Sequence, residues 1–97
     1  MTNCKSKDIQ WLSDILATIS QVYRLQIICL LNTKWELCVC DIVDDVQVKQ
    51  NLVSHHLNIL KELWLLTTRR EGKKIFYSLD KIIYKKLKED FKKIFNI

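Results

Sequence analysis

Two cysteines separated by a single residue, Cys38 and Cys40, are the side chains of this chain best suited to bind a ligand. Thiolates bind soft ions such as cadmium, lead, trivalent arsenic and zinc far better than oxygen ligands do. On a regular helix, residues two positions apart point about 200° away from each other, so the pair cannot share one ion there. At a helix N-terminus both sulfurs can turn inward, and the helix end favours the thiolate form. We therefore expect the pair at the start of a helix that deforms when an ion binds.

The positive charge of the chain lies in its second half. Residues 1–48 carry four Lys and Arg against six Asp and Glu, a net charge of −2, whereas residues 49–97 carry twelve against five, a net charge of +7. A basic half joined to an acidic half predicts a polyanion as the partner of the second half. A lysine-rich surface that is merely solvated explains the same composition, so the charge alone leaves both interpretations open.

Length and composition indicate one small domain. A chain of 97 residues buries only about 60–65% of the surface of its unfolded form, so we expect a partner subunit to help stabilise it. Neither a membrane-spanning run nor a signal peptide is visible, which predicts a cytoplasmic protein with no membrane contact. In a reducing cytosol the four cysteines are expected to be free thiols, metal ligands or redox sensors rather than structural disulfides. A bond between Cys38 and Cys40 would be strained if both lay on a helix.

Hydrophobic spacing predicts four helices in the first two thirds of the chain. Their expected ranges are residues 6–20 with Ser6 as N-cap, 22–31 ended by Asn32-Thr33-Lys34, 37–46, and 50–63 after a turn at 47–49. A short helix, a tight turn and a longer helix with a polar face are typical of a helix-turn-helix, although a solvated helix face is the alternative. Amides pair with base edges and hydroxyls with phosphate. The predicted DNA contacts of this segment are Lys49, Gln50, Asn51, Ser54, His55 and Asn58.

A predicted β-hairpin follows that helix directly. Residues 65–70 and 74–79 read as strands, and Gly72 lies where the turn requires a positive φ. A basic hairpin after a DNA-reading helix is a wing, and its predicted phosphate contacts are Arg69, Arg70, Lys73 and Lys74. From residue 80 the pattern returns to helix, with an apolar stripe that so short a chain cannot cover alone. Together with the first helix, this last helix is the predicted dimer interface.

The predicted fold is mainly α with a small β-hairpin, and its elements and three motifs resemble the ArsR/SmtB family of metal-responsive winged-helix repressors. The motifs are Glu36-Leu37-Cys38-Val39-Cys40-Asp41-Ile42, Val53-Ser54-His55-His56-Leu57 and Arg70-Glu71-Gly72-Lys73. The resemblance covers roughly residues 20–80, and the Cys-Val-Cys motif is similar to that of the arsenite/antimonite and cadmium/lead sensors. It implies a homodimer that binds double-stranded operator DNA and leaves it when As(III), Sb(III), Cd(II), Pb(II) or Zn(II) binds. Residues 1–97 are then one winged helix-turn-helix domain of about five helices plus a two-stranded wing, with N- and C-terminal dimerisation helices.

The third ligand of the ion is not defined by the motif itself. The arsenite sensors often place a third cysteine three residues after the second, where this chain has Val43. The zinc sensors use Asp and His on the last helix, and no histidine follows His56 here. The cadmium/lead branch recruits cysteines from its N-terminal arm, where this chain has Cys4. Cys4 is therefore the predicted third ligand, within one subunit or across the dimer, and Cys29, water or a small thiol are the alternatives.

Other notable residues have structural interpretations. Gln47 and Trp64 replace glycines that are usual in the resembled family before the recognition helix and before the wing. Cys29 lies in an apolar helix stripe and His56 faces the core by projection, so both are expected to be buried packing residues. The acidic cluster that begins at Asp41 is expected to be a helix surface.

Three hypotheses about function follow. The leading one is a homodimeric winged-helix repressor, not an enzyme, that releases operator DNA when a thiophilic ion binds Cys38, Cys40 and Cys4. The second keeps the DNA binding and makes the thiols a redox or persulfide switch without a metal ligand. The third is a thiol oxidoreductase or metal-buffering protein with no DNA role, but no Ser/His/Asp arrangement or phosphate-cradling glycine loop supports catalysis.

Overall fold

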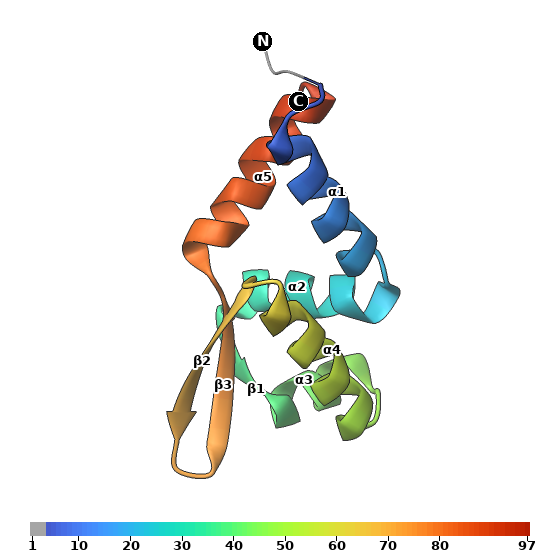
Figure 1. The fold of residues 1–97 in the computed structure, drawn as a ribbon. Coiled ribbons are helices and arrows are strands. Elements are labelled where there is room, and N and C mark those ends of the chain that lie inside the picture. The colour runs from blue at the N-terminus through green and yellow to red at the C-terminus, as the bar shows by residue number, and fades with distance from the viewer. Residues whose placement is uncertain (1–3) are drawn as a thin grey trace.

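The computed structural model describes residues 4–97, which form five helices and three strands. In chain order these are α1 (Lys7–Ile19), α2 (Val22–Lys34), β1 (Glu36–Cys38), α3 (Val39–Val46), α4 (Gln50–Glu62), β2 (Leu66–Glu71), β3 (Lys74–Leu79) and α5 (Lys81–Phe95). The molecule is elongated, with extents of 47 × 23 × 21 Å. Figure 1 shows α1 and α5 meeting near the termini and diverging toward α2, with α3, α4 and the hairpin beyond α2. The predicted mainly α fold with a wing is confirmed.

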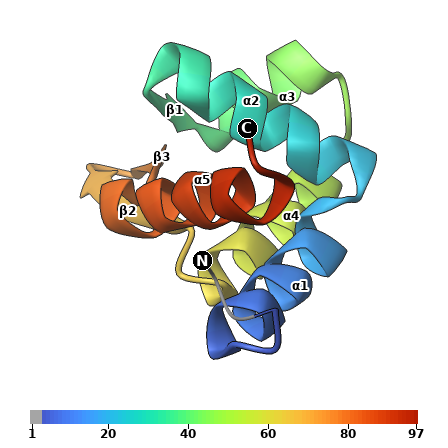
Figure 2. The ribbon, with the colours of Figure 1, turned by 90° about the horizontal axis from the view of Figure 1, so that it is seen from above.

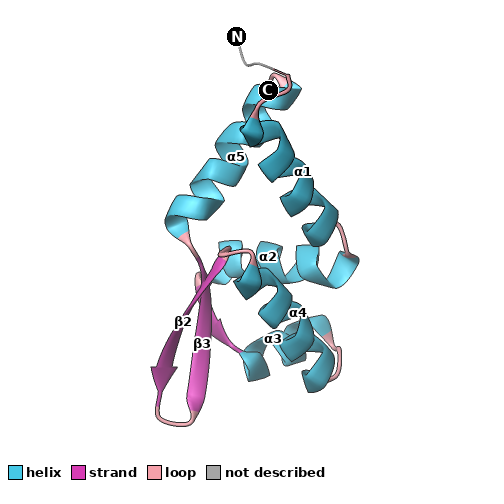
Figure 3. Cartoon of the chain, in the orientation of Figure 1, coloured by secondary structure: helices cyan, strands magenta, loops and turns pink. Residues whose placement is uncertain are grey.

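The wing belongs to a three-stranded antiparallel sheet with the strand order β1-β3-β2, drawn in magenta in Figure 3. The sequence does not predict β1, because three residues carry no alternation that separates a strand from the start of a helix. The partner strand supplies what the sequence pattern lacks: Glu36 pairs with Ser78, and Cys38 pairs with Phe76. The third helix consequently begins at Val39, two residues later than expected.

The second helix is longer than its sequence indicates. It continues to Lys34 through the three polar residues that are expected to end it. The hydroxyl of Thr33 donates to the carbonyl of Cys29 at 2.9 Å, so this polar side chain is satisfied inside the helix. Cys29 itself is exposed, and its predicted burial is wrong. The reason is geometric, because Ile27 and Leu31 lie on the buried face of α2, and Cys29, two positions from each of them, points away from that face.

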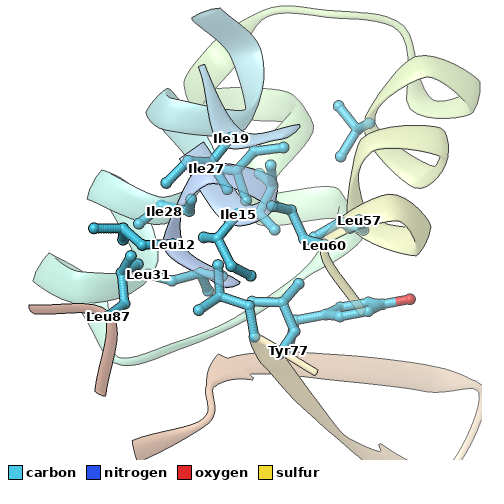
Figure 4. Close-up of a cluster of buried hydrophobic side chains, with 14 residues drawn as sticks. Leu12, Ile15, Ile19, Ile27, Ile28, Leu31, Leu57, Leu60, Tyr77 and Leu87 are labelled. Carbon is cyan, nitrogen blue, oxygen red and sulfur yellow. The ribbon is translucent and has the colours of Figure 1, made fainter. Parts of the chain in front are cut away.

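The hydrophobic core joins α1, α2, α3, α4 and the sheet. Figure 4 shows Ile15, Ile27 and Leu60 from three different helices pointing toward one another, with Tyr77 of β3 beside them. Ile42 of α3 also belongs to this cluster and is fully buried. Complete burial of such a side chain stabilises the fold by about 1.5–3 kcal/mol. The core therefore holds α3 and α4 at a fixed angle to the rest of the domain.

The long helices α1 and α5 are joined by charged groups near the start of α1. Lys86 donates to Asp8 at 2.9 Å and to the buried Asp90 at 2.8 Å, and its ammonium lies over the ring of Trp11. Ser6 occupies the predicted N-cap position of α1, but its side chain makes no cap hydrogen bond. Seen from above, α5 lies between α1 and α2 (Figure 2). An apolar groove runs between these three helices, and its lining includes Leu16, Leu25, Leu87, Phe91 and Ile97.

Within residues 4–97, no helix taken alone has both the length and the apolar character needed to cross a membrane. The helices α1 and α2 meet that criterion only when counted together, and the chain bends by 102° between them.

Two turns that flank α4 require the left-handed backbone conformation. Gln47 ends α3 with φ 54°, and Trp64 follows α4 with φ 62°. Glycine adopts this conformation freely, whereas a side chain with a Cβ atom costs about 1–2 kcal/mol there. The side chain of Trp64 is 77% exposed, so its burial offsets little of that strain. The turns of the winged fold are thus kept here despite the absence of glycine.

We expect Trp64→Gly to have a free energy of unfolding about 1 kcal/mol higher than that of Trp64→Ala. Both variants lose the same exposed indole ring, and only the glycine variant relieves the strain at φ 62°. Equilibrium unfolding in denaturant measures the difference. Equal stability of the two variants would show that this turn carries no strain.

Candidate thiol centre and nucleic-acid interface

Cys38 and Cys40 lie at the junction between β1 and α3. Cys38 is the last residue of β1 and the N-cap of α3, with extended backbone angles (φ −82°, ψ 167°), and Cys40 is in the first turn of the helix. Their Cα atoms are 5.4 Å apart, and the two sulfurs form a disulfide bond in this structure. The expectation of free thiols is therefore wrong for Cys38 and Cys40, whereas Cys4 and Cys29 are free. The strain argument behind it requires both residues to lie on the helix, and Cys38 precedes it.

Asp41 completes a cluster of potential ligands with the two cysteines. Its Oδ2 atom accepts the backbone N–H of Cys38 at 3.3 Å and lies 3.2 Å from the sulfur of Cys38. One ligand atom from each of the three residues lies within 4.8 Å of the other two. From the sequence alone, Asp41 is expected only on a helix surface. Its position three residues after an N-cap, where an acidic side chain reaches back to the cap, is the signal that identifies it.

The other two cysteines lie outside this cluster. Cys4 is exposed and precedes α1, and Figure 1 places that end of the molecule opposite β1 and α3. Cys29 is exposed on α2, beside a shallow pocket that Thr33 and Asp45 also line. Of the four cysteines in the described part of the chain, this fold brings together only Cys38 and Cys40. A role for Cys4 as third ligand stays a prediction that requires the partner subunit.

The predicted DNA-reading face of α4 is open to solvent. Lys49, Gln50, Asn51, His55 and Asn58 are exposed and Ser54 is half-buried. Lys49 occupies the N-cap position of the helix, and Gln50 is its first residue. The opposite face packs into the core through Val53, Leu57 and Leu60. The polar face is thus available to a partner, and its contacts with DNA stay a prediction.

His56 fixes α4 against the preceding helices, as its predicted packing role requires. Its side chain is only 7% exposed, and its Nδ1 atom accepts a hydrogen bond from Nε of Arg24 at 3.2 Å. The guanidinium of Arg24 also donates to the carbonyl of Thr18 at 2.8 Å. Burial lowers the pKa of His56 below its ordinary value, and the charge of Arg24 lowers it further. A neutral His56 therefore accepts the Arg24 hydrogen bond and connects α4 to the end of α1.

In the wing, Arg69 is engaged in ion pairs with its own protein. Two of its nitrogens donate to the carboxylate of Glu36 on β1, at 2.8 and 3.2 Å, and a third donates to Glu71 at 2.6 Å. The hydrogen bond from Arg69 lowers the pKa of Glu36. The guanidinium also lies over the ring of Phe76, with 4.7 Å to its centroid. These contacts indicate that Arg69 braces the wing against β1, whereas its predicted phosphate contact is untested.

The same part of the sheet connects the wing to the thiol pair. Phe76 of β3 is the cross-strand partner of Cys38 on one side and of Arg69 on the other. Paired residues point to the same face of a sheet, so Cys38, Phe76 and Arg69 form one row. Cys38 is therefore paired directly with strand β3 of the wing.

A short helix, a left-handed turn, a longer helix with a polar face and a basic hairpin define the winged helix-turn-helix class of DNA-binding proteins. Residues 22–68 match the family described as "Bacterial regulatory protein, arsR family". The chain is 42% identical over 72 residues to the arsenical resistance operon repressor of Staphylococcus aureus. That match covers 74% of this chain and 68% of the repressor. The chain therefore belongs to the ArsR family, with proteins described as regulators of arsenical and cadmium resistance among its relatives.

Two further comparisons agree with this assignment. The chain is 37% identical over 75 residues to the CadC homologue of Staphylococcus aureus, a cadmium resistance transcriptional regulatory protein. That match covers 77% of this chain and 62% of the relative. Among solved structures, HlyU from Vibrio cholerae N16961 has a TM-score of 0.76 and 27% identity, covering 95% of this chain and 99% of that one. The two curated relatives are described as an operon repressor and a transcriptional regulatory protein.

The contacts of the wing generate a prediction about DNA binding. Lys73→Gln removes a cation from the wing turn and is expected to lower the slope of log Kd against log salt concentration by about 1 per subunit. Arg69→Gln removes a cation that is already paired with Glu36 and Glu71, so its slope is expected to change less. Fluorescence anisotropy with a duplex at several salt concentrations measures both slopes. A larger change for Arg69→Gln than for Lys73→Gln would assign the phosphate contact to Arg69.

Proposed function

We propose that this repressor releases operator DNA when a thiophilic ion, As(III)/Sb(III) or Cd(II)/Pb(II), binds at Cys38 and Cys40. The observation that carries the proposal is the cluster of two sulfurs and one carboxylate at the start of α3, all within 4.8 Å of one another. Soft ions select thiolates over other protein ligands, so the donor set fits such an ion once the disulfide is reduced. Zn(II) is a further candidate, because zinc accepts both sulfur and carboxylate ligands.

The relatives support an ion as inducer without identifying it. One is described as an arsenical resistance operon repressor and another as a cadmium resistance regulatory protein. Because this chain spans between 62% and 68% of the length of these two proteins, ligand preferences are not transferred from them. A DNA-binding role would place the protein in the cytoplasm.

The placement of the pair gives a physical route from ligand to DNA. A bound soft ion would supply strong bonds to sulfur. Cys38 would then hold the end of β1, and Cys40 the first turn of α3, at one point. Since α3 packs against α4 in the core and β1 pairs with β3 of the wing, a shift of either cysteine moves elements on both sides of the proposed DNA surface. The arrangement of α3, α4 and the wing without the ion would then bind DNA more tightly, and the arrangement with the ion would bind DNA less tightly. Such a difference is what a coupling between two sites requires.

A homodimer would supply what one subunit lacks. The apolar groove between α1, α2 and α5 is lined in part by Ile97, which is 78% exposed, and the last helix also exposes Ile82 and Phe95. A second copy is the partner we propose for this surface. In that assembly Cys4 of one subunit would approach the thiol pair of the other as third ligand.

The disulfide in the structure favours a second candidate function. If the pair is oxidised in the cell, the protein is a redox- or persulfide-responsive repressor whose signal is the sulfur link itself. In the first candidate the thiols bind an ion, and in the second they form a sulfur link. In both, the proposed effect on DNA binding passes from Cys38 through β1 and α3.

A titration of the reduced protein–DNA complex with arsenite, cadmium, lead and zinc distinguishes the candidates. We expect at least one ion to weaken DNA binding by about 5–150-fold, and Cys38→Ser and Cys40→Ser to abolish that response. The matched control is Cys29→Ser, which removes an exposed thiol outside the cluster and should respond as wild type does. The ion-sensing proposal fails if no ion weakens binding or if Cys38→Ser keeps the full response. Release by a mild oxidant alone, with the Cys38–Cys40 link found by mass spectrometry, would establish the second candidate.

A further inference from the structure

A pocket of about 210 Å³ opens beside the thiol pair, and the wing supplies one side of it. Its lining includes Cys38 and Cys40, the first residue of α4, Gln50, and two lysines of the wing, Lys73 and Lys74. These residues come from distant parts of the chain, and the pairing of Cys38 with Phe76 places the wing lysines next to the start of α3. The thiol pair thus lines a pocket together with one amide and two ammonium groups, which can bind a ligand.

The charge of the pocket selects the kind of ligand. Among the described residues that line it, two are cationic and none is acidic. The nearby carboxylate of Asp41 is hydrogen-bonded to the backbone of Cys38, and that of Glu71 is paired with Arg69. A small anion is therefore attracted to the pocket by Lys73 and Lys74, and the amide of Gln50 adds a hydrogen-bonding group.

The two sulfurs differ in their access to such a ligand. Cys40 is exposed, whereas only 4% of Cys38 is accessible to solvent. Asp41 Oδ2 lies 3.2 Å from the sulfur of Cys38, within reach of its proton when the pair is reduced. An exposed thiol beside a buried one, close enough to form a disulfide, is an arrangement suited to stepwise exchange with an external disulfide.

We propose that this pocket binds low-molecular-weight disulfides that carry carboxylate groups and that their reduction forms the Cys38–Cys40 disulfide. The thiolate of Cys40 attacks one sulfur of the bound disulfide, whose S–S bond breaks, and half of the molecule leaves as a thiolate. Cys38 then loses its proton to solvent, and its sulfur attacks that of Cys40, displacing the second half as another thiolate. The protein pair loses two electrons and the small disulfide gains them. This chemistry extends the redox candidate above by naming its oxidant.

The test uses the reduced full-length protein without metal or DNA, so its failure leaves the ion-sensing proposal standing. Two probes of similar size are compared, dithiodiglycolate, which carries two carboxylates, and bis(2-hydroxyethyl) disulfide, which is neutral. Peptide mapping by mass spectrometry follows the Cys38–Cys40 link over time at low salt. The double variant Lys73→Gln/Lys74→Gln should lower the ratio of the anionic to the neutral rate by about fivefold or more.

The matched control removes the same charge elsewhere. Lys85→Gln/Lys88→Gln changes two lysines of α5, outside the pocket, and should leave the rate ratio as in wild type. Mixed disulfides at Cys29, which is exposed, report the intrinsic preference for each probe in the same molecule. Equal ratios for the two double variants would overturn the assignment of the pocket.

Single cysteine variants test the order of the two steps. Cys38→Ser should accumulate a mixed disulfide at Cys40, because the second step is removed. Cys40→Ser should form little adduct at Cys38, because the buried sulfur does not meet the probe. Equal adduct formation at the two positions would contradict the roles assigned to them.

Discussion

The three residues of β1 pair with β3 and bring the end of a strand, the start of α3 and the wing to one place. Without this pairing Cys38 would be a helical residue and would point away from Cys40. With it, the backbone of Cys38 is extended, its sulfur is bonded to that of Cys40, and the carboxylate of Asp41 accepts the backbone N–H of Cys38. The ion pair between Glu36 and Arg69 secures the same strand from its other end, across the sheet. A short strand thus determines both the geometry of the thiol centre and the position of the wing.

This arrangement explains how a small site can influence DNA binding in a small domain. The thiol pair is connected to the wing through the row Cys38, Phe76 and Arg69, and to the recognition helix through the packing of α3 on α4. The two routes meet on either side of the surface that the exposed residues of α4 and the basic residues of the wing create. Under the proposed function, metal binding and disulfide formation would both draw the two sulfurs together, so the junction of β1 and α3 would serve either signal.

Much of the fold follows from the sequence because long, regular patterns specify it. The polar and apolar faces of α4, the turn before it and the hairpin around Gly72 are all readable from residue spacing. The strand β1 cannot be predicted from the sequence, since its three residues become a strand only by pairing with β3. The position of Asp41 beside Cys38 and the Cys38–Cys40 disulfide both depend on where α3 begins. Because the sequence does not define that residue, it predicts neither of them. Cys29 shows the other limit, since apolar residues occur on several sides of α2 and only its packing in the fold shows which side is buried.

The proposed function requires that Cys38 and Cys40 bind one ion together at the start of α3. X-ray absorption of the protein loaded with cadmium or arsenite measures the sulfur neighbours of the ion directly. We expect both sulfurs of the pair to remain bound to the ion in Cys4→Ser, and the ion in Cys38→Ser to have one sulfur neighbour fewer. An ion with no more than one sulfur neighbour in Cys4→Ser, or a sulfur count unchanged in Cys38→Ser, would contradict it.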